Sequence, residues 1–169
     1  KDKFGVPYGD LNKVQLTLGE TDITDKRIQP KFKTKKKSKL QLRDYQETVM
    51  VEIEKFLAEG GTAFNLSGEP GSGKSFMLAN ILTKLGTKTL IIAHLSQLTR
   101  QLAKEIEEVL GYKPTILDKD TKELGDINIA TSQLISKNPD LWYLIKKGIG
   151  CIVIDEAETL ASLSTLRIV

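Results

Sequence analysis

Two patterns of apolar and polar positions alternate along the chain from residue 40 onwards. Short apolar runs without proline are typical of buried strands. Longer segments with apolar residues at every third or fourth position are typical of amphipathic helices. The sequence therefore predicts strands at 62–66, 89–93, 115–117, 127–130 and 151–154, and helices that end at the glycines of positions 60, 86, 111 and 148. This alternation predicts an α/β fold with right-handed crossovers around a mainly parallel sheet that is covered on both faces.

The first 40 residues differ in composition from the rest of the chain. They carry 11 Lys and Arg against 5 Asp and Glu, whereas residues 41–169 carry 14 against 17, so the net charge of +3 comes from the amino-terminal part. Six of the nine residues at 31–39 are lysines, which predicts an exposed linker. Such a linker either binds phosphate backbones non-specifically or is a solvated tether, and both interpretations stay open. A strand at 14–18 is weakly indicated. We divide the chain into an arm at 1–39 and a body at 40–169.

The overall composition is that of a soluble globular protein, with 40% apolar and 28% charged residues. The sequence has no apolar run long enough to span a membrane and no apolar core of a signal peptide. Its one cysteine, Cys151, excludes an internal disulfide framework and a cysteine zinc cluster. Because Cys151 begins an apolar run, we expect a buried, unreactive thiol. These features predict a cytoplasmic protein without a membrane partner.

A glycine-rich stretch follows the predicted strand at 62–66 and begins the next helix. It fits the pattern G-x-x-x-x-G-K-[ST]. In such a loop the backbone N–H groups converge at a helix amino terminus, where the helix dipole favours a polyphosphate. We expect Lys74 to contact the β- and γ-phosphates of the nucleotide and the Ser75 hydroxyl to bind Mg²⁺. The predicted nucleotide-binding residues are Gly68, Glu69, Pro70, Gly71, Ser72, Gly73, Lys74 and Ser75.

A pair of acidic residues, Asp155 and Glu156, follows the last apolar run at 151–154. A parallel strand brings the residue after it to the carboxyl edge of the sheet, where ligands bind in open α/β folds. We expect Asp155 to hold Mg²⁺ through water, and Glu156 to orient and deprotonate the attacking water. The predicted catalytic residues are thus Lys74 and Glu156, and the predicted ligands are a nucleoside triphosphate and Mg²⁺.

The loop at 68–75 together with the Asp-Glu-Ala-Glu run at 155–158 resembles motifs I and II of superfamily 2 helicases, in their first RecA-like motor domain. The resemblance covers about residues 40–160. It implies a P-loop NTPase with a RecA-like three-layer sandwich. It also implies that the chain binds nucleic acid and works with a second RecA-like domain.

Three further segments support this resemblance. The Leu-Arg-Asp-Tyr-Gln run at 42–46 is similar to an element of the DNA-translocase branch, whose glutamine contacts the adenine edge; this implies adenine contacts for Gln46 and, secondarily, Arg43. The segment at 94–101 resembles motif Ia, which implies a nucleic-acid contact for Gln101. For His94 we favour a loop residue at a strand end over a direct phosphate ligand. The segment at 129–134 resembles the motif whose threonine touches a phosphate of the bound strand, here Thr131.

Two departures from the family pattern affect the expected activity. Glu158 stands where the family mostly has His or Asp, and the sequence reaches Val169 before a serine-alanine-threonine motif or the arginine fingers of a second domain. The resemblance therefore predicts ATP binding with slow hydrolysis by this polypeptide alone. It favours an ATP-dependent DNA helicase or translocase over one acting on RNA. An AAA+ switch or loader that acts through protein partners is the alternative, and a P-loop small-molecule kinase is less favoured.

Overall fold

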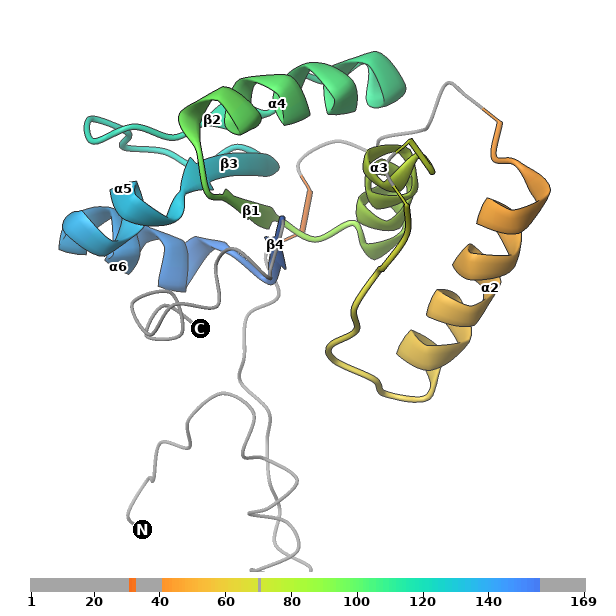
Figure 1. Cartoon of the computed structure of the whole chain (residues 1–169). Helices are drawn as coiled ribbons and strands as arrows, with labels where there is room; N and C mark the ends of the chain where they lie inside the picture. The colour runs from red at the N-terminus through yellow and green to blue at the C-terminus, as the bar shows by residue number, and fades with distance from the viewer. Residues whose placement is uncertain (1–30, 33–40, 70, 156–169) are drawn as a thin grey trace, which may run out of the picture.

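The computed structural model of the chain describes residues 31–32, 41–69 and 71–155 (Figure 1). Within these residues one parallel sheet has the strand order β2-β3-β1-β4. The strands are β1 (Thr89–Ala93), β2 (Thr115–Ile116), β3 (Ile127–Thr131) and β4 (Cys151–Ile154). The expected α/β fold with a parallel sheet is confirmed.

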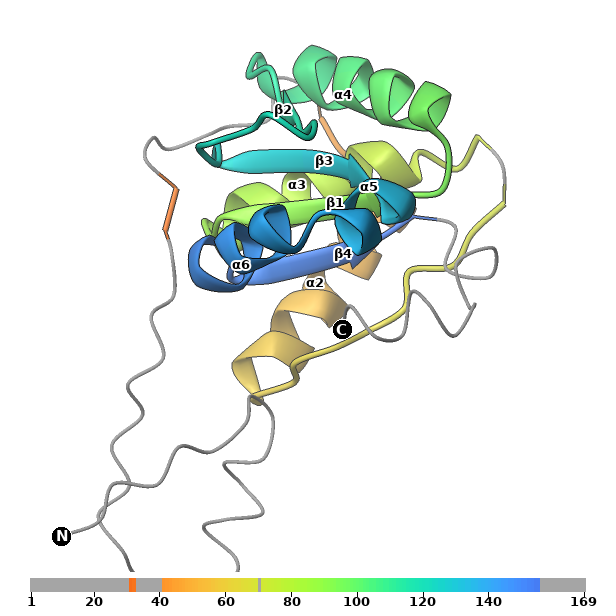
Figure 2. The ribbon, with the colours of Figure 1, turned by 90° about the vertical axis from the view of Figure 1, so that its left-hand side faces the viewer.

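Helices cover both faces of this sheet (Figure 2). They are α2 (Asp44–Ala58), α3 (Lys74–Leu85), α4 (Ser96–Leu110), α5 (Ser132–Lys137) and α6 (Pro139–Gly148). Helices α3 and α4 pack on one face, and α5 and α6 pack on the other. Helix α2 lies beside α3, on the side of α3 that faces away from the sheet (Figure 1).

Strand β1 is the centre of the hydrophobic core. All five of its residues are buried, because it has a strand on each side and helices on both faces. Ile91 points into the cluster formed with α3 and α4, whereas Leu90 and Ile92 point into the cluster formed with α5 and α6. Each fully buried Leu or Ile side chain contributes roughly 1.5–3 kcal/mol to stability. The side chains of β1 thus contribute to the hydrophobic core on both faces of the sheet.

Helix α2 is held to α3 by a smaller apolar cluster. Met50 and Ile53 of α2 pack against Ile81 of α3, and all three side chains are buried. Lys84 and Glu54 form an ion pair across the same contact, but both side chains are about half exposed, so its contribution to stability is small. Apolar packing therefore fixes where the amino end of α2 lies.

The predicted strand at 62–66 is wrong. This segment has no strand structure, and four of its five residues are exposed. Its apolar side chains contact helices instead: the Phe64 ring packs edge-to-face on Phe56, with 6.2 Å between ring centroids, and Leu66 packs against the cluster between α2 and α3. A short apolar run has no period that separates a strand from a loop anchored on helices, which explains the error.

The other predicted elements within the described residues are confirmed. Strands β1 to β4 lie where the apolar runs predicted them, and α2, α3, α4 and α6 end at or within two residues of the predicted glycines. Helix α5 was not predicted. The weakly indicated strand at 14–18 and most of the lysine-rich linker lie outside the described residues. None of the helices in the described part of the chain is long and apolar enough to span a membrane.

A buried asparagine joins the loop before β3 to the start of β1. Asn128 is fully buried, and its amide donates to Thr89 O at 3.1 Å and Gly125 O at 3.0 Å while accepting from Gly125 N at 2.8 Å. One of these bonds, to Thr89 O, is buried, and the two to Gly125 are partly buried. Asn128 therefore holds the loop against the amino-terminal edge of the sheet.

Replacing Asn128 by Ala removes all three of these hydrogen bonds. We expect Asn128→Ala to lower the free energy of unfolding by about 3 kcal/mol, measured by urea denaturation. Gln133→Ala, at an exposed position of α5, is the control and should change it by less than about 0.5 kcal/mol. Equal stability of the two variants would contradict this role for Asn128.

Candidate functional site

The candidate site lies at the carboxyl edge of the sheet. Ala93 of β1 is opposite Thr131 of β3, and Ile92 is opposite Ile154 of β4, so these three strands end at one level. Asp155 continues the pairing, because its backbone N–H donates to Ile92 O at 2.9 Å. The polar residues that directly follow or end these strands are therefore brought to the same edge.

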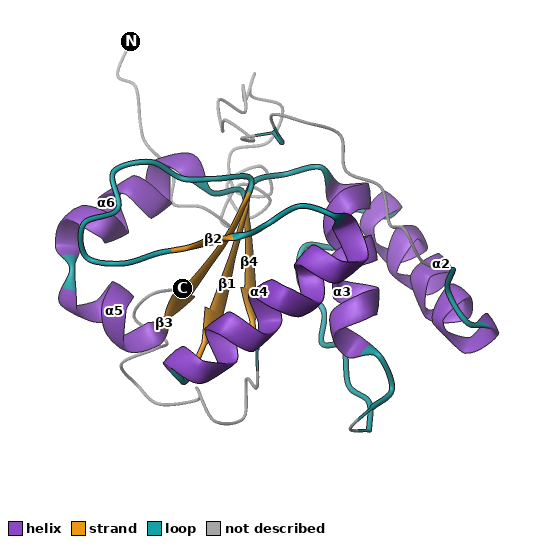
Figure 3. Ribbon diagram, turned by 90° about the horizontal axis from the view of Figure 1, so that it is seen from above, coloured by secondary structure: helices purple, strands orange, loops and turns teal. Residues whose placement is uncertain are grey.

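The glycine-rich loop reaches this edge because of the direction of α3. Only three residues connect the end of α3 to β1, so the helix runs antiparallel to the strand that follows it. Its 12 residues span about 18 Å, close to the roughly 16 Å of the five residues of β1. The amino end of α3 thus lies at the level of the carboxyl ends of the strands. Figure 3 shows this loop at the end of the sheet to which the strands point.

The loop conformation explains its glycines. Gly71 and Gly73 have φ of 81° and 76°, in the left-handed region that side chains rarely adopt. At Gly68 a Cβ would lie 2.8 Å from the Ser72 hydroxyl oxygen, so a side chain would fill the inside of the turn. The Ser72 hydroxyl is buried and makes no hydrogen bond with the described residues. A glycine-rich turn at a helix amino terminus, with an unbonded hydroxyl, fits a phosphate group.

Lys74 folds back over this loop. Its ammonium group donates to Gly68 O at 2.7 Å and to Glu69 O at 3.0 Å. Both acceptors are neutral backbone carbonyls, which are weaker partners for an ammonium group than a phosphate oxygen. The side chain therefore already lies at the loop where the sequence predicts the phosphates.

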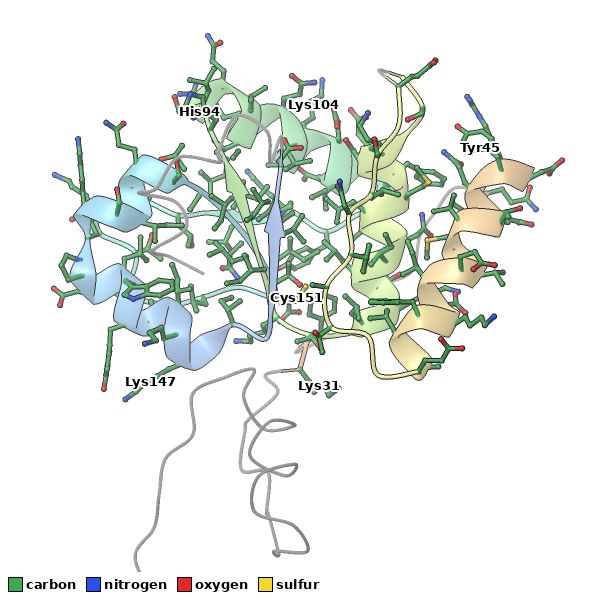
Figure 4. The ribbon with its side chains drawn as sticks, turned by 60° about the horizontal axis from the view of Figure 1, so that its bottom comes forward. Lys31, Tyr45, His94, Lys104, Lys147 and Cys151 are labelled. Carbon is green, nitrogen blue, oxygen red and sulfur yellow. The ribbon has the colours of Figure 1, made fainter. Side chains whose placement is uncertain are left out.

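The first turn of α2 contacts the loop directly. Gln46 is buried, and its side chain donates to Ser72 O at 3.2 Å and accepts from Arg43 N at 3.0 Å. The neighbouring Tyr45 hydroxyl donates to the same Ser72 O at 2.7 Å. In Figure 4 Tyr45 and His94 lie at the end of the molecule to which β4 points, and Cys151 lies at the opposite end of that strand. The sequence alone indicates no role for Tyr45, although this residue lies in the element at 42–46 that resembles the DNA-translocase branch.

The residues predicted to contact nucleic acid lie at or near the same edge. The Thr131 hydroxyl accepts from Leu134 N at 3.2 Å and so caps α5. Gln101 is exposed on α4, where it donates to Glu105 at 2.9 Å, one helical turn further on. His94 follows β1 and is exposed, as expected for a loop residue at a strand end.

The acidic half of the predicted site is described only in part. Asp155 is half-buried directly after β4, as predicted, whereas Glu156 and, in the loop, Pro70 lie outside the described residues. Within the described residues no group of three or more His, Cys, Asp or Glu side chains could hold a metal ion. Mg²⁺ bound to a nucleotide typically has only one or two protein ligands, because the phosphates supply other oxygens. Ser75 and Asp155 fit such a site.

Cys151 lies away from this edge, at the start of β4. It is half-buried rather than fully buried as predicted, because β4 pairs with β1 and, within the described residues, with no strand on its other side. Burial raises the pKa of the Cys151 thiol above its ordinary value, and a hydrogen bond with Thr89 opposes this shift. The raised pKa keeps the thiol neutral at physiological pH, consistent with an unreactive cysteine.

One edge of a parallel sheet thus carries both a glycine-rich loop and the aspartate that follows a neighbouring strand. The family match bears out the resemblance of this chain to the first RecA-like motor domain of superfamily 2 helicases. The chain belongs to the family described as type III restriction enzyme, res subunit, whose model matches residues 39–168.

A probable helicase and UvrABC system proteins B are among the similar proteins. The probable helicase D10 of Escherichia phage T5 is 23% identical over 156 residues, which are 92% of this chain and 30% of the phage protein. UvrABC system protein B of Leptospira biflexa is 36% identical over 132 residues, covering 63% of this chain and 19% of that protein. A solved structure of a hypothetical ATP-dependent RNA helicase from Sulfolobus tokodaii has a TM-score of 0.49 and 21% identity, and covers 75% of this chain and 45% of that one. The chain spans less than a third of the length of these two curated relatives.

The capping bond of Thr131 gives this residue a structural role that stability measurements can test. We expect Thr131→Ala to lower the free energy of unfolding by about 1 kcal/mol, because α5 loses its N-cap. Thr131→Ser keeps the hydroxyl and should retain nearly full stability. Thermal denaturation of both variants measures this difference, and equal losses would contradict the capping role.

Proposed function

We propose that the loop at 68–75 binds the triphosphate of ATP and that this motor domain couples ATP hydrolysis to movement along nucleic acid. The observation that carries the proposal is the shared edge: the loop at the amino end of α3 and Asp155 after β4 lie at the same end of one sheet. The left-handed glycines of the loop and the buried, unbonded Ser72 hydroxyl support a phosphate ligand there.

Lys74 is the residue whose contacts change when nucleotide binds. In the structure its ammonium group bonds two loop carbonyls. Phosphate oxygens carry negative charge, so they outcompete neutral carbonyls for this cation. We propose that Lys74 exchanges its bonds to Gly68 and Glu69 for bonds to the β- and γ-phosphates. Part of the binding energy then comes from replacing a weak acceptor by a strong one.

The metal and the attacking water belong to the other half of the site. Ser75 and Asp155 would hold the Mg²⁺, which neutralises charge on the phosphates. Glu156 follows Asp155 directly, and we propose that it orients and deprotonates the attacking water. Lys74 stabilises the charge that develops on the transferred phosphoryl group.

Nucleic acid is the proposed partner beyond the ATP site. The segment after β1 is exposed from His94 to Gln97, and Arg100 and Gln101 are exposed on the first turns of α4. These residues and Thr131 present polar groups at the carboxyl edge, near the proposed ATP site. We favour DNA because the Leu-Arg-x-Tyr-Gln element at 42–46 resembles the DNA-translocase branch. A second RecA-like domain is the proposed partner that completes the ATP site.

A mutation of the loop lysine tests the ATP site. We expect Lys74→Ala to weaken ATP binding by at least about tenfold, since a charge-assisted contact contributes roughly 1.5–3 kcal/mol. Isothermal titration of the full chain with ATP and Mg²⁺ measures the loss. Lys104→Ala is the matched control, because that side chain is 80% exposed on α4 and should bind as the unaltered chain does. Equal affinities of both variants would contradict the proposed site.

The adenine contact proposed for Gln46 has its own test. If Gln46 also contacts the base, Gln46→Ala should weaken ATP binding more than GTP binding. The reason is that adenine, but not guanine, presents the hydrogen-bonding edge that the Gln46 amide would match. Competition with a fluorescent nucleotide gives both affinities. Equal losses for ATP and GTP would contradict base recognition and leave Gln46 with its contacts to the Ser72 carbonyl and Arg43 N.

Single-stranded DNA and RNA distinguish the proposed partners. A polypeptide that contains this domain and its second RecA-like domain should hydrolyse ATP faster when single-stranded DNA is added. If RNA stimulated hydrolysis and DNA did not, RNA rather than DNA would be the partner. The absence of stimulation by either would favour an ATPase switch that acts through protein partners.

A further inference from the structure

Two neighbouring side chains of α2 converge on one carbonyl of the glycine-rich loop. The Tyr45 hydroxyl donates to Ser72 O at 2.7 Å, and the Gln46 amide donates to the same oxygen at 3.2 Å. A Cβ added to Gly73 would lie 2.6 Å from the Gln46 amide nitrogen, so the start of α2 packs directly against the loop. The Ser72 carbonyl is therefore held on the side of the loop that faces α2.

This contact fixes the direction of the next backbone N–H. The peptide bond between Ser72 and Gly73 is trans, and the C=O and N–H of a trans peptide point in opposite directions. A carbonyl held toward α2 thus turns the Gly73 N–H away from α2. Gly73 precedes Lys74, the first residue of α3, so this N–H lies at the amino end of the helix, where the dipole favours an anion.

Two donors on one carbonyl also strengthen the N–H of the same peptide. Hydrogen bonds to a carbonyl oxygen polarise the peptide group, so its N–H becomes a better donor. Without the two contacts, the peptide before a glycine could rotate, because glycine accepts many backbone conformations. The contacts from α2 therefore supply both the orientation and part of the donor strength.

We propose that Tyr45 is a positioning residue for nucleotide binding: its hydroxyl holds the Ser72–Gly73 peptide with the Gly73 N–H oriented to donate to a phosphate. The inference rests on the proposed function of the loop. It extends the role of the Leu-Arg-x-Tyr-Gln element from the base to the phosphates. Tyr45 acts through the loop, since its bond is to the Ser72 carbonyl.

Tyr45 is a better residue for testing this than Gln46. Gln46 is buried and also bonds Arg43 N, so its removal disturbs the start of α2 as well as the loop. The Tyr45 side chain is 45% exposed, and Tyr45→Phe removes only the hydroxyl. Tyr143→Phe is the matched control, because Tyr143 is exposed on α6 and its ring contact with Lys147 survives the loss of a hydroxyl.

Isothermal titration of the full chain with ATP and with GTP, each with Mg²⁺, measures the effect. We expect Tyr45→Phe to bind both nucleotides about three- to tenfold more weakly, as the loss of one hydrogen bond predicts. The ratio of the ATP and GTP affinities should not change, because the hydroxyl contacts the loop rather than the base. Tyr143→Phe should bind as the unaltered chain does.

Nuclear magnetic resonance of the ¹⁵N-labelled chain gives a signature that a purely structural role would not change. In the unaltered chain the Gly73 amide resonance should move to lower field when ATP binds, as expected for an N–H that donates to a phosphate. In Tyr45→Phe this displacement should be smaller, while the resonances of β1 and β3 keep their positions.

The outcomes separate this inference from the function on which it rests. Failure of the unaltered chain to bind either nucleotide overturns the proposed function. Binding by the unaltered chain with equal affinity in Tyr45→Phe overturns only the role of Tyr45. A loss for ATP without a loss for GTP would place Tyr45 at the base and also overturn the positioning role.

Discussion

The structure depends on the parallel pairing of β1 with β3 and β4. Because β1 is buried on all sides, its register with both neighbours is fixed by apolar side chains that fit only one arrangement. Parallel strands end at the same edge, so this pairing aligns Ala93, Thr131 and Asp155. The short connection from α3 to β1 then brings the glycine-rich loop to that edge. The core thus determines where the polar residues of the site meet.

The loop itself depends on its contact with α2. A glycine-rich turn has many accessible conformations, and ordering it costs conformational entropy. The apolar cluster between α2 and α3 places Tyr45 and Gln46 against the Ser72 carbonyl. Preorganisation of this kind favours binding, because the ordering cost is met during folding. Helix α2 therefore links the stability of the fold to the shape of the proposed phosphate site.

The sequence predicted those features that depend on local pattern. The apolar run at 89–93 identified β1, and the loop glycines were identifiable because positive φ at Gly71 and Gly73 restricts the residue type. The strand at 62–66 was predicted wrongly because Phe64 and Leu66 pack on helices rather than in the sheet. Helix α5 was missed because six residues are too few to show a helical period.

Contacts between distant segments were beyond the reach of the sequence. The bonds from Tyr45 and Gln46 to Ser72 join residues 27 and 26 positions apart, and nothing in either segment alone predicts them. The same is true of Asn128, whose type suggests a turn but whose side chain holds the loop before β3 to β1. Tertiary packing decides such contacts, and local residue preferences do not.

Nuclear magnetic resonance of the ¹⁵N-labelled chain with ATP and Mn²⁺ in place of Mg²⁺ tests the central claim most directly. A paramagnetic ion broadens only the amide signals close to it. If the loop and the end of β4 share one metal–nucleotide site, the amides of Ser75 and Asp155 should both broaden, while that of Tyr143 on α6 keeps its width. Broadening at Ser75 without broadening at Asp155 would contradict the account.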